Sequence, residues 1–221
     1  MNTTGTDDSQ VMLLNDWVVR VQQPKGSDAQ RIFLMLHGFT GDENSMSVFT
    51  RSLPRNAWIF SPRAPFPTNE GGYKWIPSEN GLSASLKVFL DAAFNLQEAL
   101  SGWKKAFQLP DQKIEIAGFS QGAVMALTYA LNNPKQIHRV ACLSGFLPHD
   151  TTNLIHGRPL TGIPIFLAHG TEDKTVSFER AQEARVWLEQ FGAEITVCDS
   201  PVGHRISASC FRSFADFFRE A

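Results

Sequence analysis

The segment that most constrains the fold is an apolar run that leads into Gly-x-Ser-x-Gly and continues as a helical pattern of small residues. It occupies residues 114–127, with Gly118, Ser120 and Gly122 at its centre. Glycine on both sides of the serine predicts a strand that turns sharply into a helix, because a Cβ at either position would collide with neighbouring backbone. Free N–H groups and the positive end of the helix dipole would then face the serine. Ser120 is therefore a candidate nucleophile; the alternative is a serine that caps a helix in a tight glycine turn.

Strand-like and helical patterns alternate along the chain, which predicts an α/β fold: a mostly parallel sheet with helices on both faces. Several strand-like runs are apolar almost throughout, as expected for strands covered on both sides; the runs are residues 17–21, 32–37, 57–61, 113–118, 139–144, 164–169 and 194–199. Apolar residues at helical spacing predict further helices over residues 89–107, 178–191 and 206–217. We expect residues 1–10 to be a flexible tail and residues 11–221 to form a single domain.

Composition excludes several classes of partner. The net charge of −2 argues against nucleic acid and anionic membranes, which need a basic surface. No run of apolar residues is long enough for a transmembrane helix, and the polar N-terminus has no signal-peptide pattern. The three cysteines show no Cys-x-x-Cys spacing, so neither a zinc site nor a disulfide framework is expected. Cys142 and Cys198 fit buried apolar positions in strands, and this cysteine usage favours a reducing, cytoplasmic location.

A serine hydroxyl is a weak nucleophile at neutral pH, so a functional Ser120 needs a histidine base and a carboxylate that orients this base. In such strand–turn–helix sites the chain order is serine, acid, histidine. Of six histidines, His204 alone lies in a loop after the last strand-like run. A turn after residues 164–169 offers Glu172 and Asp173, and we favour Asp173 because it lies deeper in the turn. The alternatives are a helix-capping histidine and a turn-forming aspartate.

An oxyanion formed at this serine needs backbone N–H donors that are already in place. The first candidate is the N–H of Gln121, the residue after the nucleophile. The second should come from a loop after an earlier strand, and the glycine-rich turn at residues 36–42 supplies the N–H of Phe39. We expect His37 and Asp42 of the same turn to hold the loop and to take no part in chemistry.

Two long irregular stretches, residues 62–82 and 146–162, follow strands and should therefore reach the carboxyl edge of the sheet, where open α/β folds bind ligands. Their apolar residues are candidate walls of a substrate site; these are Tyr73, Trp75, Phe146 and Leu147. An alternative for Trp75 is that it pins its loop to the body of the protein.

With these segments in hand, the chain resembles the carboxylesterase and acyl-protein thioesterase family of α/β-hydrolases, also called the phospholipase/carboxylesterase family. The matching segments run in the same order along nearly the whole chain; they are residues 36–42, 62–65, 118–122, 143–148, 169–173 and 203–204. The resemblance implies Ser120, Asp173 and His204 as a catalytic triad and the N–H groups of Phe39 and Gln121 as the oxyanion hole. It also implies hydrolysis of esters or thioesters with no metal and no organic cofactor.

One loop departs from the thioesterase members of this family. They carry a Trp-aromatic-Asp segment where residues 70–77 read Glu-Gly-Gly-Tyr-Lys-Trp-Ile-Pro, closer to the bacterial serine esterase branch. The short interval from Ser144 to Pro164 also leaves no room for the large lid that other branches insert there. We therefore expect a serine carboxylesterase for small or medium acyl esters, with a small-molecule ester substrate. The alternatives are thioesterase, lysophospholipase-type or acyl-transfer activity, and a non-catalytic binding protein; a monomer and a homodimer are both compatible with the sequence.

Overall fold

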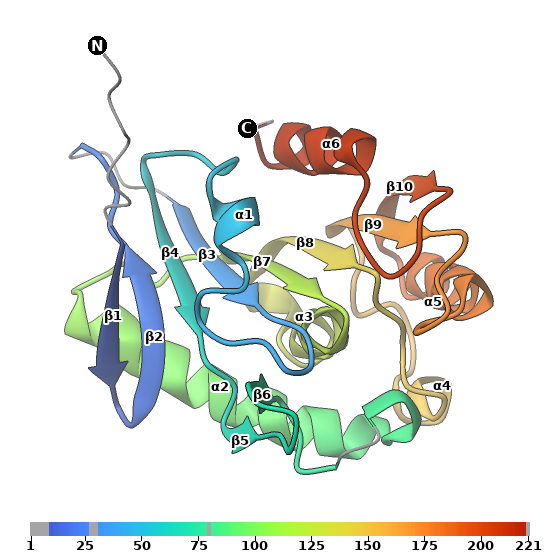
Figure 1. Cartoon of the computed structure of the whole chain (residues 1–221), viewed down its shortest axis with the longest axis horizontal. Helices are drawn as coiled ribbons and strands as arrows, with labels where there is room; N and C mark the ends of the chain where they lie inside the picture. The colour runs from blue at the N-terminus through green and yellow to red at the C-terminus, as the bar shows by residue number, and fades with distance from the viewer. Residues whose placement is uncertain (1–8, 27–30, 79–80, 220–221) are drawn as a thin grey trace.

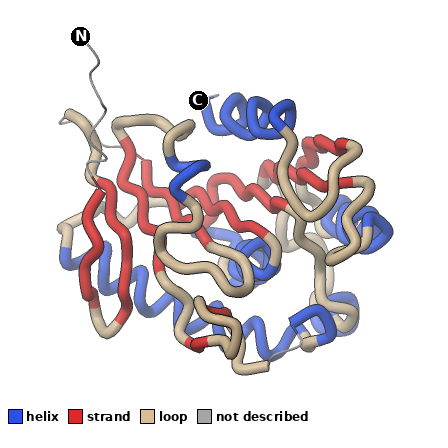
Figure 2. The backbone as a smooth tube through the Cα atoms, viewed as in Figure 1, coloured by secondary structure: helices blue, strands red, loops and turns tan. Residues whose placement is uncertain are grey.

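An eight-stranded sheet in the order β1-β2-β4-β3-β7-β8-β9-β10 is the centre of the computed structural model, which describes residues 9–26, 31–78 and 81–219. The strands of this sheet are β1 (Ser9–Leu14), β2 (Trp17–Gln22), β3 (Arg31–Leu36), β4 (Ala57–Pro62), β7 (Ile114–Phe119), β8 (Ile137–Leu143), β9 (Pro164–Gly170) and β10 (Glu194–Ser200). A separate two-stranded ribbon consists of β5 (Phe66–Pro67) and β6 (Tyr73–Lys74). The large sheet crosses the molecule from the β1–β2 hairpin to β10 (Figure 2).

The helices are α1 (Ser47–Thr50), α2 (Leu86–Ala106), α3 (Gln121–Asn132), α4 (Thr151–Leu154), α5 (Phe178–Gln190) and α6 (Ala208–Arg219), with short 3₁₀ turns at Gly81–Ser83 and Pro134–Gln136. All strands from β3 and β4 to β10 in the large sheet run parallel, while β1 and β2 add an antiparallel edge. The predicted α/β fold with a mostly parallel sheet is confirmed. Within the described residues, no helix has the length and apolar character that a membrane span requires.

The edge strand β1 differs from the sequence-based expectation. Ser9 and Gln10, which we assigned to a flexible tail, are the first residues of this strand, while residues 1–8 of the expected tail lie outside the described part. Asn15 and Asp16 both have positive φ and connect β1 to β2 as a two-residue turn. Such turns favour Asn and Asp because both residues tolerate the left-handed region. The polar residues at the start of β1 hid its strand pattern in the sequence, whereas Asn15 and Asp16 could have indicated the hairpin turn.

Each face of the sheet has its own hydrophobic cluster. On one face α3 covers the central strands, α2 packs beside it and α5 covers β9 and β10, with Trp103, Tyr129 and Leu188 fully buried. On the other face α1 and α6 contribute Phe49 and Phe214, whose rings lie 5.4 Å apart. Figure 1 shows α6 and α2 on opposite sides of the sheet. The expected helices on both faces are therefore present.

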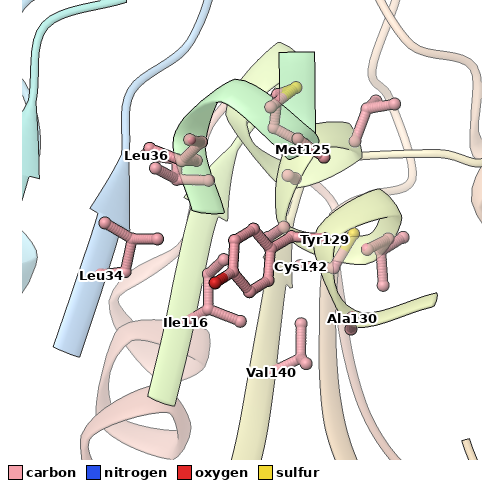
Figure 3. Packing of buried hydrophobic residues seen from close by; sticks show 14 of the residues in the cluster. Leu34, Leu36, Ile116, Met125, Tyr129, Ala130, Val140 and Cys142 are labelled. Atoms are coloured by element: carbon pink, nitrogen blue, oxygen red, sulfur yellow. The ribbon is translucent and has the colours of Figure 1, made fainter. Parts of the chain in front are cut away.

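Helix α3 is the most deeply buried of the helices. Its residues from Gln121 to Leu131 are all buried. Figure 3 shows Met125, Tyr129 and Ala130 packed against Leu36, Ile116 and other apolar side chains of the sheet. Small residues at the start of the helix allow this close approach to β3 and β7. Because this packing holds the helix in place, it also fixes the position of the turn that precedes the helix.

The cysteines correct another expectation. Cys198 in β10 and Cys210 in α6 form a disulfide, with Cα atoms 5.5 Å apart, whereas the sequence indicated no disulfide and an unpaired Cys198. The spacing of the pair follows no local motif, because a strand, a loop and a helix start lie between them. Cys142 is free and buried, as expected. Disulfides persist in oxidising compartments, so the cysteines no longer favour a reducing location.

Candidate active site

The turn between β7 and α3 has the geometry that its glycines predict. Ser120 has φ 53° and ψ −118°, a left-handed conformation that is rare for residues with a side chain. A Cβ on Gly118 would lie 2.0 Å from the Gly122 carbonyl oxygen, and one on Gly122 would lie 2.2 Å from the Leu36 carbonyl oxygen. Only glycine fits at both positions. The Ser120 N–H donates to the Leu143 carbonyl at 2.8 Å, which anchors the turn to β8.

A continuous line of hydrogen bonds joins the three residues that the chain order selected. His204 Nε2 lies 2.8 Å from Ser120 Oγ, and His204 Nδ1 lies 2.7 Å from Asp173 Oδ2. The Asp173 side chain is fully buried and that of His204 is 22% exposed. Because the carboxylate can only accept, Nδ1 carries the proton in this arrangement and Nε2 is free to accept the hydroxyl proton of Ser120. The elements that bring them together are the carboxyl ends of β7, β9 and β10.

The carboxylate is held from several directions. Asp173 Oδ1 accepts hydrogen bonds from the Thr175 and Val176 N–H groups at 2.8 and 3.0 Å. His169 at the end of β9 has its Nε2 2.9 Å from the Val176 carbonyl and 3.4 Å from Asp173 Oδ2. Glu172, the competing acid, is exposed, and its N–H donates to the Val202 carbonyl. Of the two acids in this turn, the structure brings Asp173 to His204.

The two expected oxyanion donors come from the loop after β3 and from the start of α3. Phe39 follows β3, and Gln121 begins α3 directly after the serine. Neither backbone N–H donates to a backbone carbonyl in the described part of the chain. A Cβ on Gly38, next to Phe39, would be 3.4 Å from the Ser120 Cβ, so this loop passes close to the nucleophile. An oxyanion formed at Ser120 needs N–H donors of this kind that are already in place.

His37 is a structural residue of the first loop. Its Nδ1–H donates to the Gly38 carbonyl at 2.7 Å, and its Nε2 accepts from the Ala64 N–H at 3.0 Å. Burial lowers the pKa of His37 below its ordinary value, which keeps the ring neutral. Glu43 nearby forms a two-point ion pair with Arg63, and this pairing lowers the pKa of Glu43. The hydrogen bond from Ala64 to His37 and the ion pair between Glu43 and Arg63 tie the loop after β3 to the loop after β4.

A cavity of about 230 Å³ opens beside Ser120. Its lining comes from loops and turns at the carboxyl edge of the sheet and consists of Phe39, Gly81, Leu82, Ser120, Gln121, Phe146 and Thr175. Among the four expected wall residues, the structure places Phe146 in this lining. Sequence reasoning missed Gly81, Leu82 and Thr175. The position of Thr175 two residues after Asp173 was a usable signal. Gly81 and Leu82 end the irregular stretch 62–82 that we expected at the carboxyl edge, but we did not single them out as wall residues.

The other expected wall residues lie elsewhere. Trp75 is fully buried, donates its indole N–H to the His37 carbonyl at 2.7 Å, and stacks on Trp17. Together with Tyr73 it borders a second cavity of about 790 Å³ between the β1–β2 turn and α2. Leu147 is buried in the core. For Trp75 these contacts match the alternative expectation that it pins its loop. In the described part of the chain, no three His, Cys, Asp or Glu side chains gather as a metal site would require.

Comparisons with known proteins show which family and which fold the chain resembles. The sequence profile of the family described as Phospholipase/Carboxylesterase matches residues 18–221. Carboxylesterase SOBER1 of Arabidopsis thaliana is 31% identical over 197 residues, which cover 81% of this chain and 85% of that protein. Acyl-protein thioesterase 1 of Candida albicans is 34% identical over 102 residues, 44% of each chain. The crystal structure of a carboxylesterase from Mesorhizobium loti superposes with a TM-score of 0.83 at 20% identity, covering 97% of this chain and 100% of that one.

Proposed function

The chain belongs to the phospholipase/carboxylesterase family of α/β-hydrolases, and from this premise we propose that it is a serine carboxylesterase for small or medium acyl esters. Family membership makes it a hydrolase of ester bonds. The observation that carries the finer proposal is the hydrogen-bonded line Ser120–His204–Asp173 beside the 230 Å³ cavity. The small cavity, with Phe39, Leu82 and Phe146 in its wall, favours a short acyl chain.

In the first half of the reaction, the Ser120 hydroxyl donates its proton to His204 Nε2 while Oγ attacks the ester carbonyl carbon. Asp173 accepts the Nδ1–H bond and stabilises the imidazolium that forms. The carbonyl oxygen becomes an oxyanion, which accepts hydrogen bonds from the N–H groups of Phe39 and Gln121. Each such donor contributes a rate factor of about 10² to 10³.

In the second half, the imidazolium of His204 gives its proton to the departing alcohol, which leaves an acyl group on Ser120. Water then enters, His204 takes a proton from it, and the hydroxide attacks the acyl carbonyl. Collapse of the second tetrahedral species releases the carboxylic acid and returns the proton to Ser120. This sequence uses the same base and the same oxyanion donors twice.

The test is hydrolysis of short p-nitrophenyl esters by the wild type and by Ser120→Ala. We expect the substitution to lower kcat by about 10⁴-fold or more, the usual cost of removing a catalytic serine. Ser144→Ala is the matched control. Ser144 also follows a parallel strand with positive φ, at 51°, but its buried hydroxyl has no partner in the described residues. Full activity in Ser120→Ala, or equal loss in both variants, would overturn the proposal.

Two further measurements separate the alternatives. A fluorophosphonate probe should form an adduct on Ser120 of the wild type; absence of the adduct would favour a binding protein that has kept only the fold. Rates on an ester and a thioester of the same acyl group, with added alcohol in parallel, distinguish ester hydrolysis from thioester hydrolysis and acyl transfer.

A further inference from the structure

His169 is a buried histidine to which the proposed mechanism gives no part. It is the next-to-last residue of β9, and its side chain is only 4% exposed. It is not one of the residues that line the Ser120 cavity. The contacts of its ring lead instead to the turn that carries Asp173. Any influence of His169 on the reaction must therefore pass through Asp173.

The position of the proton on the His169 ring follows from its partner. Nε2 lies 2.9 Å from the Val176 carbonyl oxygen. Because a carbonyl can only accept, Nε2 carries a hydrogen and donates it. Asp173 Oδ2 lies 3.4 Å from the same nitrogen. This distance is longer than that of a full hydrogen bond, but a polarised N–H so close to a buried carboxylate still attracts its charge, since little water is present to screen it.

The contacts of His169 close the turn that carries the carboxylate. Val176 donates its N–H to Asp173 Oδ1 at 3.0 Å and accepts the His169 Nε2–H on its carbonyl. The side chain of Val176 is fully buried, which anchors this end of the turn. The His169 nitrogen also approaches Oδ2 of Asp173, the same oxygen that accepts the His204 Nδ1–H at 2.7 Å. One N–H group thus reaches both the backbone of the turn and the oxygen that orients the base.

We propose that His169 is a positioning residue for the reaction: its Nε2–H holds the turn at Asp173 so that Oδ2 stays directed at His204. This inference rests on the proposed esterase function. The fixed point is β9, which is paired with β8 on one side and with β10 on the other. Rotation of the carboxylate away from this position would lengthen its hydrogen bond to His204 and leave the imidazole free to turn.

The first test removes the donor. His169→Phe keeps a planar ring but has no N–H, and we expect kcat on short p-nitrophenyl esters to fall by about 10- to 100-fold, the cost of displacing a catalytic group by about 1 Å. KM should stay near its wild-type value, because the ring does not border the substrate cavity. Phe178→Leu is the matched control. Phe178 packs on the His169 ring at 6.3 Å between centroids, so this variant changes the packing, keeps the donor and should keep wild-type kcat.

A pair of amides tests where the donor must lie. The side-chain nitrogen of glutamine reaches about as far as Nε2 of a histidine, whereas the shorter asparagine places its nitrogen near the Nδ1 position. His169→Gln should therefore keep most of the wild-type kcat, and His169→Asn should lose about as much as His169→Phe. Both variants leave a polar side chain in the same place, so a role in packing alone would not separate them. Urea unfolding identifies the variants that are folded, and the amide pair carries the test if His169→Phe is not.

A double-mutant cycle with Asp173→Asn distinguishes positioning from an independent structural role. Asp173→Asn alone should lower kcat by about 10⁴-fold, because the base loses the group that fixes its tautomer. If His169 acts through this carboxylate, adding His169→Phe to Asp173→Asn should lower kcat little further. A loss as large as that in the wild-type background would mean that His169 acts independently of Asp173.

Three results would overturn the inference: wild-type kcat in His169→Phe, equal kcat in His169→Gln and His169→Asn, and full additivity in the cycle. Failure of the proposed function has a different signature. In that case no ester is hydrolysed in a way that depends on Ser120, whereas failure of the present inference leaves Ser120-dependent hydrolysis intact and insensitive to the donor at residue 169.

Discussion

The backbone of Ser120 is held in a left-handed conformation that costs about 1–3 kcal/mol in a residue with a side chain. Two features offset this cost: the hydrogen bond from the Ser120 N–H to Leu143, and the buried packing of α3. The strain also serves the chemistry, because it lifts Oγ out of the strand and toward His204. The flanking glycines permit the turn, so replacing one of them should lower the free energy of unfolding.

Gly122→Ala should lower the free energy of unfolding by about 3 kcal/mol, the upper range for an overpacked core. The added Cβ would lie 2.2 and 2.4 Å from the carbonyl oxygens of Leu36 and His37, and backbone cannot rotate away as a side chain can. Urea unfolding measures the change. Gly203→Ala is the matched control, since its Cβ would meet its nearest neighbour at 3.9 Å. Equal midpoints for the two variants would contradict the close packing of α3 on β3.

At the level of elements, the loop that carries His204 is closed at its base. The Cys198–Cys210 disulfide joins β10 to α6, and inside it Ser200 Oγ and Ser207 Oγ lie 2.8 Å apart. The two cross-linked cysteines therefore lie on either side of the proposed base, His204, in the sequence. Closing a loop of this length stabilises a protein by about 3 kcal/mol through the entropy of the unfolded chain.

Replacing both Cys198 and Cys210 with serine should therefore cost about 3 kcal/mol in urea unfolding. Thiol counting provides the independent check. In urea without reductant one thiol should react, that of Cys142, and all three should react after reduction. In the native protein Cys142 should resist alkylation, because burial raises its pKa to about 12. Three reactive thiols in unreduced urea, after trapping during purification, would show that the disulfide is not formed.

At the scale of the whole molecule, the sequence predicted the features that repeat along the chain or follow its order. The apolar strands, the helical stripes and the turn around Ser120 depend on local chemistry, so the sheet and its central helix were predictable. The order serine, acid, histidine then selected the residues that the structure places in contact. Two features that depend on contacts between distant segments were not predicted: the cross-link from Cys198 to Cys210, and which residues of the stretch 62–82, Gly81 and Leu82, line the pocket.

Trp75 illustrates the limit for the candidate site. Its loop follows a strand and reaches the carboxyl edge, which made it a reasonable wall residue. The structure turns the ring inward against Trp17 and His37, so its role in the described structure is to hold the two loops. Which way a loop side chain turns depends on the partners that the rest of the fold supplies, and no local pattern encodes these partners.

The same buried loop makes the stability of the whole molecule depend on pH. His37 is neutral in the fold, because burial lowers its pKa and because Nε2 accepts the Ala64 N–H, which a protonated ring could not do. In the unfolded chain the ring titrates near its ordinary value of 6.5. Below that pH the unfolded state binds a proton that the folded state does not, so stability rises with pH in this window and is lost as the pH falls. One such proton changes the free energy of unfolding by up to about 1.4 kcal/mol per pH unit.

His37→Gln should remove this dependence, because the amide oxygen of glutamine can accept the Ala64 N–H and does not titrate. We therefore expect the difference in unfolding free energy between wild type and His37→Gln to be largest, in favour of the wild type, at pH 7.5. It should shrink as the pH falls below 6.5 toward the lowered pKa of the folded state. Urea unfolding of both proteins at pH 7.5, 6.5 and 5.5 measures it. Glu43 does not interfere, because its pairing with Arg63 lowers its pKa from a normal value of 4.5 and confines its effect to more acidic pH. A difference that stays constant across the series would contradict a neutral buried His37, and one that widens toward acid pH would reverse the sign.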